Sequence, residues 1–236
     1  MRHRFGLFPL VVILAAAAAA QDLAPLDPPI EDKHAFGVIP NNRTTEASYP
    51  FQPISTRRKL TIAAKDSFDT PIYATTLFFA SIYQIDNDTP SFGQGMAGYG
   101  KRAAAAFGDQ MIGNMMTEGV MPALLHEDPR YFRIGEGTRK HRLGYALAQI
   151  FVTHTDSGGR TFNFAEWGGN AATVALGNAW YPDNRNAWDN AQKLATQCAT
   201  DAFSNVLKEF WPDVKRYFER RHERHLAHAA RSGSAQ

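Results

Sequence analysis

Cysteine is nearly absent from the chain, since Cys198 is the only one among its 236 residues. A single thiol excludes an intramolecular disulfide, so the fold has to be held together by a packed core. Cys198 lies near Leu194, Ala199 and Ala202 at helical spacing, which is typical of a small, buried apolar side chain. We therefore interpret Cys198 as a core residue rather than a nucleophile.

An excess of either charge is also absent, because 25 Lys and Arg residues face 23 Asp and Glu residues, for a net charge of +2. Residues 1–20 begin with Arg2 and Arg4, continue as an apolar stretch and end in Ala18-x-Ala20, the pattern of a cleavable signal peptide. Cleavage near Ala20 removes both arginines and brings the charge from +2 to 0. A neutral chain argues against a nucleic-acid partner. We expect an exported protein, periplasmic or peripheral to a membrane.

Alternating strand patterns, internal repeats and nucleotide fingerprints are absent as well. The glycines of "DNDTPSFGQGMAGYG" follow no predicted strand, "DSGGR" has no lysine after its glycines, and Ser157 lacks a G-x-S-x-G setting. A chain of this length can bury one sizeable core. The sequence therefore predicts an all-α, single-domain bundle of about six helices packed through small Gly and Ala residues.

The helical domain is expected over residues 55–222. Residues 21–54 contain six prolines, which predicts an extended or disordered leader, and the leader could also wrap around the domain. Residues 223–236 are expected to form a basic, frayed tail. The C-terminal helix from Lys215 onward carries excess positive charge, with five arginines and two glutamates, so an anionic membrane surface is a candidate partner.

Several helix boundaries can be assigned from capping residues and prolines. Ser55 is expected to cap a first helix, and Pro71 to begin an uncharged second one. A third helix, about Tyr99–Leu125, is low in charge and rich in small residues, which favours burial in a bundle. The last long helix is expected from about Ala187 to Trp211, with an interruption at Pro212.

Three of the predicted helices carry polar stripes at steps of three or four residues. Such stripes are either solvated faces, a buried structural network or the lining of a ligand site. If they converge inside the bundle, the candidate ligand-binding residues are Asn114, Glu118, Asn170, Asp201 and Asn205.

The segment before the second of these stripes predicts a capping box. Asn163 precedes the helix and Glu166 stands three residues on, so each side chain is expected to bond the backbone N–H of the other. This interpretation makes Glu166 structural.

A second interpretation groups polar residues from three loops into a hydrolase-like or metal-dependent site: His126, Asp128, Asp156, Arg160 and Glu166. In "HEDPRYFR", adjacent residues point in different directions, so His126 and Glu127 are poor joint metal ligands. The alternative is structural: His126 ends a helix, Asp128 pairs with Arg130, and "DSGGR" is a salt-bridged turn. We assign no metal, and the cofactor stays open.

Three long blocks resemble recurring blocks of a family of uncharacterised exported bacterial proteins: "LLHEDPRYFR", "TDSGGRTFNFAEWGGNAA" and "DAFSNVLKEFWPDVKR". The resemblance covers about residues 98–216. It implies kinship and export, and it transfers no activity, cofactor or catalytic residue.

The leading hypothesis is an exported binding, scaffold or envelope-associated protein, with a homo-oligomer as a further expectation. One alternative is the enzyme with a polar site around His126, Asp156 and Glu166. The other is an integral membrane protein that spans with Pro71–Ile85 and Ala103–Leu125, against which stand Asp109 and Glu118 in the second segment.

Overall fold

The computed structural model describes residues 34–35 and 39–233, with side chains for 41–225, so the predicted signal peptide lies outside it. The chain is predominantly helical, and the predicted all-α bundle is confirmed. Its helices are α2 (Thr56–Ser67), α3 (Thr70–Ile85), η2 (Pro90–Phe92), α4 (Gly95–Asn114), η3 (Met115–Val120), α5 (Met121–Leu125), α6 (Arg139–Ala148), α7 (Phe164–Gly177) and α8 (Ala187–Gly233). The segments α4, η3 and α5 follow one another without a break, and η3 is a π-helical turn.

Three pairs of very short strands accompany the helices. The antiparallel pairs are β1 (His34–Ala35) with β2 (Ile39–Pro40), and β5 (Val152–His154) with β6 (Arg160–Phe162). The parallel pair is β3 (Thr44–Glu46) with β4 (Tyr131–Arg133). Strands of two or three residues are too short to give an alternating pattern, so the sequence did not predict them. Through β3, the end of the predicted leader is fixed to the helical domain.

The predicted helix starts are largely confirmed. The Ser55 hydroxyl accepts a hydrogen bond from the Arg58 N–H at 3.2 Å, and a proline lies in the first turn of α3. At α7, the Asn163 side chain accepts from the Glu166 N–H at 3.0 Å. The other half of the predicted capping box is wrong, because the Asn163 N–H donates to the Phe151 carbonyl instead. The Glu166 side chain is therefore available for the interior.

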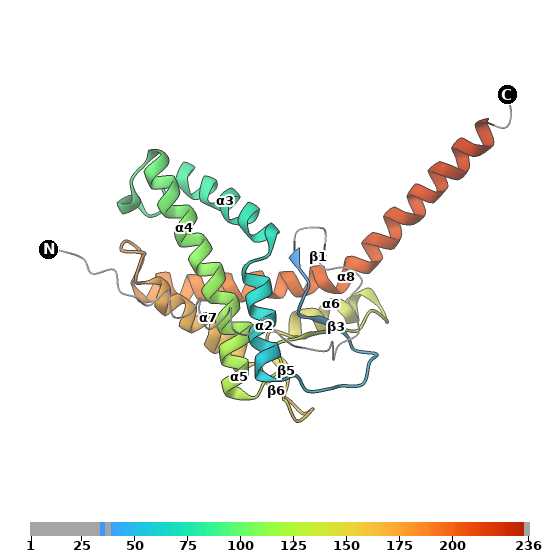
Figure 1. Cartoon of the computed structure of the whole chain (residues 1–236), viewed down its shortest axis with the longest axis horizontal. Helices are drawn as coiled ribbons and strands as arrows, with labels where there is room; N and C mark the ends of the chain where they lie inside the picture. The colour runs from blue at the N-terminus through green and yellow to red at the C-terminus, as the bar shows by residue number, and fades with distance from the viewer. Residues whose placement is uncertain (1–33, 36–38, 234–236) are drawn as a thin grey trace.

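The predicted interruption at Pro212 is also wrong, since α8 continues through it. A proline has no N–H for the carbonyl four residues earlier, which here belongs to Lys208. That carbonyl accepts a long hydrogen bond from Arg133 Nη1 at 3.5 Å, and the next carbonyl, of Glu209, accepts from Arg142 Nη2 at 2.6 Å. Arginines from neighbouring elements thus satisfy this stretch of backbone, and α8 bends along its length instead of ending (Figure 1).

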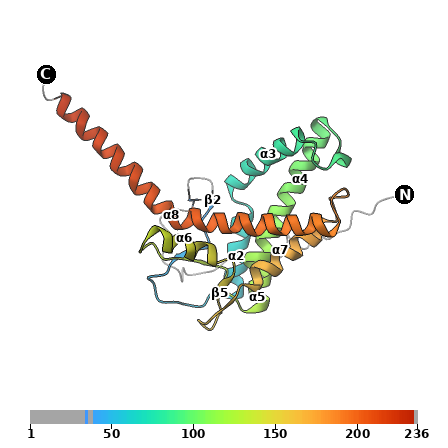
Figure 2. The same cartoon turned by 180° about the vertical axis from the view of Figure 1, so that it is seen from behind.

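The elements form a body and a projecting hairpin (Figures 1 and 2). In the body, α2 and α7 pack against η3, and α8 packs against α6 and α7. The hairpin consists of α3 and the first part of α4, and α4 is the main neighbour of α3. None of the helices in the described ranges is both long and apolar enough to cross a membrane.

Candidate functional site

The polar stripes of α7 and α8 meet inside the body. Asn170 is buried, and its Nδ2 donates to Asp201 Oδ2 at 3.0 Å and to Glu166 Oε1 at 3.4 Å. Asn205, one turn beyond Asp201 on α8, is buried as well. The side chains of these stripes therefore bond to one another in the interior rather than facing solvent.

The stripe of α4 joins this network through the π-helical turn. Glu118 in η3 is buried, and its Oε1 lies 3.3 Å from Arg43 Nε, which the strand segment β3 brings in from the leader. The carboxylates of Glu118, Glu166, Asp201 and Asp66 all favour the charged form of Arg43. Asp66 is itself held by Asn42, whose Nδ2 donates to Asp66 Oδ1 at 2.5 Å.

We call six of these side chains the buried charge cluster: Arg43, Asp66, Glu118, Glu166, Asp201 and Lys208. Burial, together with the neighbouring Asp66 carboxyl, raises the pKa of Glu118. Burial and the neighbouring Asp201 also raise the pKa of Glu166, and burial beside Arg43 lowers the pKa of Lys208. The raised pKa values of Glu118 and Glu166 and the lowered pKa of Lys208 all reduce the charge that this interior has to hold.

A glycine brings α7 close enough to η3 for this arrangement. A Cβ added at Gly169 would lie 2.9 Å from the backbone N and Cα of Thr117, which is closer than real Cβ contacts. Only a residue without a side chain fits there. Gly169 thus fixes the distance between the helix that carries Glu166 and the turn that carries Glu118.

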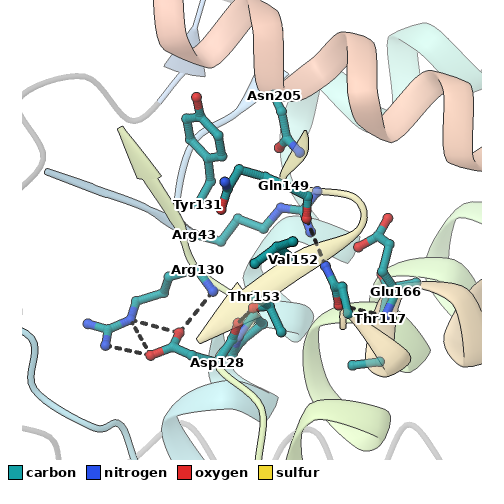
Figure 3. A pocket seen from close by; sticks show the side chains of 13 residues that line it. Arg43, Thr117, Asp128, Arg130, Tyr131, Gln149, Val152, Thr153, Glu166 and Asn205 are labelled. Carbon is teal, nitrogen blue, oxygen red and sulfur yellow. Dashed lines mark hydrogen bonds and ion pairs between the residues drawn. The ribbon is translucent and has the colours of Figure 1, made fainter. Parts of the chain in front are cut away.

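A small cavity of about 20 Å³ lies on one side of the cluster, and Arg43, Glu166 and Asn205 are among its lining residues (Figure 3). Figure 3 also shows the Arg130 guanidinium bound to the Asp128 carboxylate beside it, with Nη2 and Oδ2 2.7 Å apart. This volume has room for about one water molecule, far less than a substrate needs.

A larger cavity of about 490 Å³ lies on the other side, and we call it the helix groove. Helix α3 contributes an apolar and aromatic wall that includes Ile72, Phe79 and Tyr83. The opposite wall is polar, with Asp109 and Asn114 from α4, Asn170 and Thr173 from α7, and Asp201 from α8. The groove therefore has an aromatic side and a side rich in hydrogen-bond acceptors.

Asp109 is one of three carboxylates that line the groove, together with Asp88 and Asp201. It accepts from Trp180 Nε1 at 3.1 Å and from the Tyr181 hydroxyl at 2.6 Å. Burial nevertheless raises the pKa of Asp109 to about 6, although these two hydrogen bonds and Lys193 act in the opposite direction. This carboxylate therefore titrates close to physiological pH.

The two cations that line the groove are already occupied by neutral acceptors. Arg102 donates to the carbonyls of Asp88, Thr89 and Gly93 and to two side-chain amides, and so fixes the loop between α3 and α4. Lys193 donates to the Asn184 carbonyl at 2.7 Å and lies over the Tyr181 ring. Within the described part of the chain, neither Asp109 nor Asp201 lies within ion-pair distance of a cation, although Lys193 acts on Asp109 and the buried cations Arg43 and Lys208 act on Asp201.

The residues of the hydrolase-like interpretation do not gather around one cavity. The His126 side chain is 83 % exposed, in a left-handed backbone conformation, with Nδ1 3.7 Å from Asp156 Oδ2. Asp156 instead holds the buried ammonium of Lys59, whose Nζ lies 2.7 Å from both carboxylate oxygens. Arg160 is exposed, and Glu166 lies in the buried charge cluster. The "DSGGR" segment is a salt-bridged turn between β5 and β6, as the structural interpretation predicted.

The rest of "HEDPRYFR" has structural contacts. Asp128 binds Arg130, as predicted, and Glu127 Oε2 accepts from the Ala165 N–H at 2.7 Å in the first turn of α7. Across the described ranges, no group of three His, Cys, Asp or Glu side chains is placed to hold a metal ion. Cys198 is buried, as expected, and burial raises the pKa of its thiol to about 11.

Of the five ligand-binding candidates, Asn114, Asn170 and Asp201 line the groove, whereas Asn205 lines the small cavity and Glu118 is buried beside Arg43. The sequence analysis missed Arg43 and Asp109 as members of the site. Arg43 was assigned to the leader, and Asp109 was treated only as a charge in a low-charge helix. The aromatic residues Trp180 and Tyr181, which follow α7 and bind Asp109, were the sequence signal that could have indicated its role. No family model, no curated protein and no solved structure matches the chain.

Proposed function

We propose that the chain is an exported binding protein whose helix groove holds a small amphipathic molecule with a protonated amino group. The observation that carries this proposal is the groove itself, because its lining combines aromatic side chains of α3 with the carboxylates of Asp109 and Asp201. The signal-peptide pattern of residues 1–20 supports export.

The volume and lining of the groove agree with this class of ligand. Ligand sites are commonly cavities of about 300–1,000 Å³ with apolar walls and a few convergent polar groups. The apolar part of the ligand would lie against Phe79 and Tyr83, and its ammonium would lie toward Asp201 and Asp109. Aromatic faces also attract cations, so both walls favour a positively charged ligand.

The charges of the groove disfavour other ligands of the same size. An anion would face the carboxylates of Asp109 and Asp201, while Arg102 and Lys193 are bound to neutral acceptors. A neutral molecule would gain no charge attraction from these two carboxylates. The proposed ligand therefore differs from other molecules of the same size in its charge, which can be tested with probes that share one shape.

Calorimetric titration with octylamine, octanol and octanoate tests this, since the three probes share an alkyl chain and differ in charge. We expect octylamine to bind at least tenfold more tightly than the other two. Its affinity should fall below about pH 6, because Asp109 becomes protonated as the pH drops through its raised pKa of about 6.

Substitutions at the carboxylates locate the site. Asp201→Asn and Asp109→Asn should each weaken octylamine binding by about tenfold, equivalent to about 1.4 kcal/mol. Glu136→Gln, at an exposed carboxylate away from the groove, is the matched control and should change nothing. Equal binding of octanoate, or full binding by both groove variants, would contradict the proposal.

A further inference from the structure

The side of the α3–α4 hairpin that faces away from the groove is apolar and exposed. We call six side chains the outer hairpin face: Phe68, Tyr73, Leu77, Phe78, Ile85 and Met96. The most exposed are Met96 at 83 %, Ile85 at 82 % and Phe78 at 62 %. Single exposed apolar residues are ordinary, but a contiguous set of this size marks an interaction surface.

Ring contacts and a hydrogen bond to α4 fix part of this face. Phe107 of α4 stacks on Tyr73 of α3 at 5.3 Å between ring centroids and contacts Phe68 at 6.2 Å. The Tyr99 hydroxyl donates to the Leu77 carbonyl, which holds α3 against α4 at the same place. The face therefore has a fixed shape before any partner binds.

The α4 part of the hairpin also allows close approach of another helix. At Gly100 and Gly108, an added Cβ would have no atom within 4 Å, so the helix surface is open there. Ala104 lies between them at the same four-residue step and is exposed. Small residues at this spacing let a second helix pack closely against the backbone.

We infer that the outer hairpin face binds the same face of a second copy of the chain. Two hairpins related by a two-fold axis would then form a four-helix bundle, in which each apolar face covers the other. The exposed parts of the six side chains amount to roughly 700 Å², judged from the usual areas of such side chains. This is close to the roughly 800 Å² that each partner contributes to a standard interface.

The charge pattern favours a second copy over a lipid surface. Helices that lie on anionic membranes carry Lys and Arg beside their apolar face, whereas Thr70–Ile85 contains no charged residue at all. The next residues after α3 include Asp86 and Asp88, which anionic lipid headgroups would repel. The α4 part of the hairpin adds Lys101, whose Nζ donates to the Phe92 carbonyl at 3.3 Å, so the uncharged side chains of α3 can meet those of a second copy without like-charge repulsion.

Sedimentation equilibrium of the full chain at micromolar concentrations tests the inference. We expect a dimer for the unaltered protein and at least tenfold weaker association for Phe78→Glu. Leu124→Glu is the matched control, because Leu124 is 69 % exposed on α5, outside the hairpin. Circular dichroism and octylamine titration should show that both variants remain folded.

Cross-linking gives a second readout that does not depend on charge. Ser81→Cys with a short bis-maleimide should give a covalent dimer, whereas Glu136→Cys should not. The buried native Cys198 should not react. A monomer at all concentrations, or a dimer unchanged by Phe78→Glu, would overturn the inference. A monomer that floats with phosphatidylglycerol vesicles and loses this binding in Phe78→Glu would assign the face to lipid instead.

Discussion

The body and the hairpin distribute polar and apolar side chains in opposite ways. In the body, charged groups such as Lys59, Glu118 and Glu209 are buried among the helices. In the hairpin, Leu77, Phe78 and their apolar neighbours are exposed. Soluble domains normally bury the apolar groups and expose the charged ones, so each region departs from that rule in its own direction.

The difference shows what each region depends on. A buried charge is tolerated only when its partners are in place, so the body depends on contacts within the chain. Exposed apolar surface is stabilised when something covers it, so the hairpin depends on contacts beyond the chain. The helix groove lies where the two regions meet and has one wall from each.

The largest effect is expected where a buried ion pair in the body is broken. Glu209 is fully buried and accepts from Arg142 Nε at 2.7 Å, from the Tyr131 hydroxyl at 2.7 Å and from the Gly135 N–H at 2.9 Å. Glu209→Ala leaves Arg142 without this partner and should lower the free energy of unfolding in urea by about 3–5 kcal/mol. Asp213→Ala, which removes the more exposed partner of Arg142, should lower it by less than about 1 kcal/mol. Equal effects would contradict the proposed dependence of the body on its buried charges.

Glycine-to-alanine substitutions should change the free energy of unfolding by less, and in opposite directions in the body and in the hairpin. Gly169→Ala should destabilise the protein by about 1–3 kcal/mol, because its Cβ would push α7 away from η3. Gly100→Ala should instead stabilise it by about 0.5–1 kcal/mol, because the added methyl meets nothing and alanine favours the helix. Urea unfolding of both variants at dilutions where the protein is monomeric measures this contrast, and a loss of stability in Gly100→Ala would contradict the open helix surface at Gly100.

The groove carboxylate Asp109 should make stability depend on pH. Its pKa is raised to about 6 from an ordinary 3.8, so the folded protein holds this proton more tightly than the unfolded chain does. The free energy of unfolding should therefore fall as the pH rises from about 4 to about 6. Asp109→Asn should remove about 1–2 kcal/mol of this pH dependence, as measured by urea unfolding at pH 4 and pH 7. An unchanged profile would mean that Asp109 titrates normally.

The smallest effect on the isolated chain is expected at the outer hairpin face. Leu77→Ala should change the free energy of unfolding of the monomer by less than about 0.5 kcal/mol, since half of the side chain is already exposed. The measurement is made by urea unfolding at dilutions where the protein is monomeric. A loss above about 2 kcal/mol would mean that Leu77 belongs to the core of the body.

The sequence was informative where structure is set by neighbours along the chain. The cap at Ser55 and the start of α3 follow from local hydrogen bonds and fixed backbone angles, and the polar stripes follow from the helical repeat. These stripes also pointed to Asn114, Asn170 and Asp201, which line the groove.

The sequence was uninformative where a contact joins distant segments. Nothing in the sequence near Arg43 indicates that it lies against Glu118. Nothing near Lys208 indicates that Arg133 donates to its carbonyl, in place of the N–H that Pro212 lacks. The side chain of Glu166 shows the same limit, because its spacing from Asn163 predicted a cap while the tertiary packing turned it inward.

The position of Arg43 in the chain constrains the order of assembly. Arg43 is made early, on a segment that precedes every α-helix of the body, yet the carboxylates around it include Glu166 and Asp201, which come much later. The interior charges can be balanced only once α8 has been synthesised and the segment of Arg43 and β3 has packed against the helices. Contacts between such distant residues form slowly, so closure by β3 should be a late, rate-limiting step that seals an otherwise formed helical body.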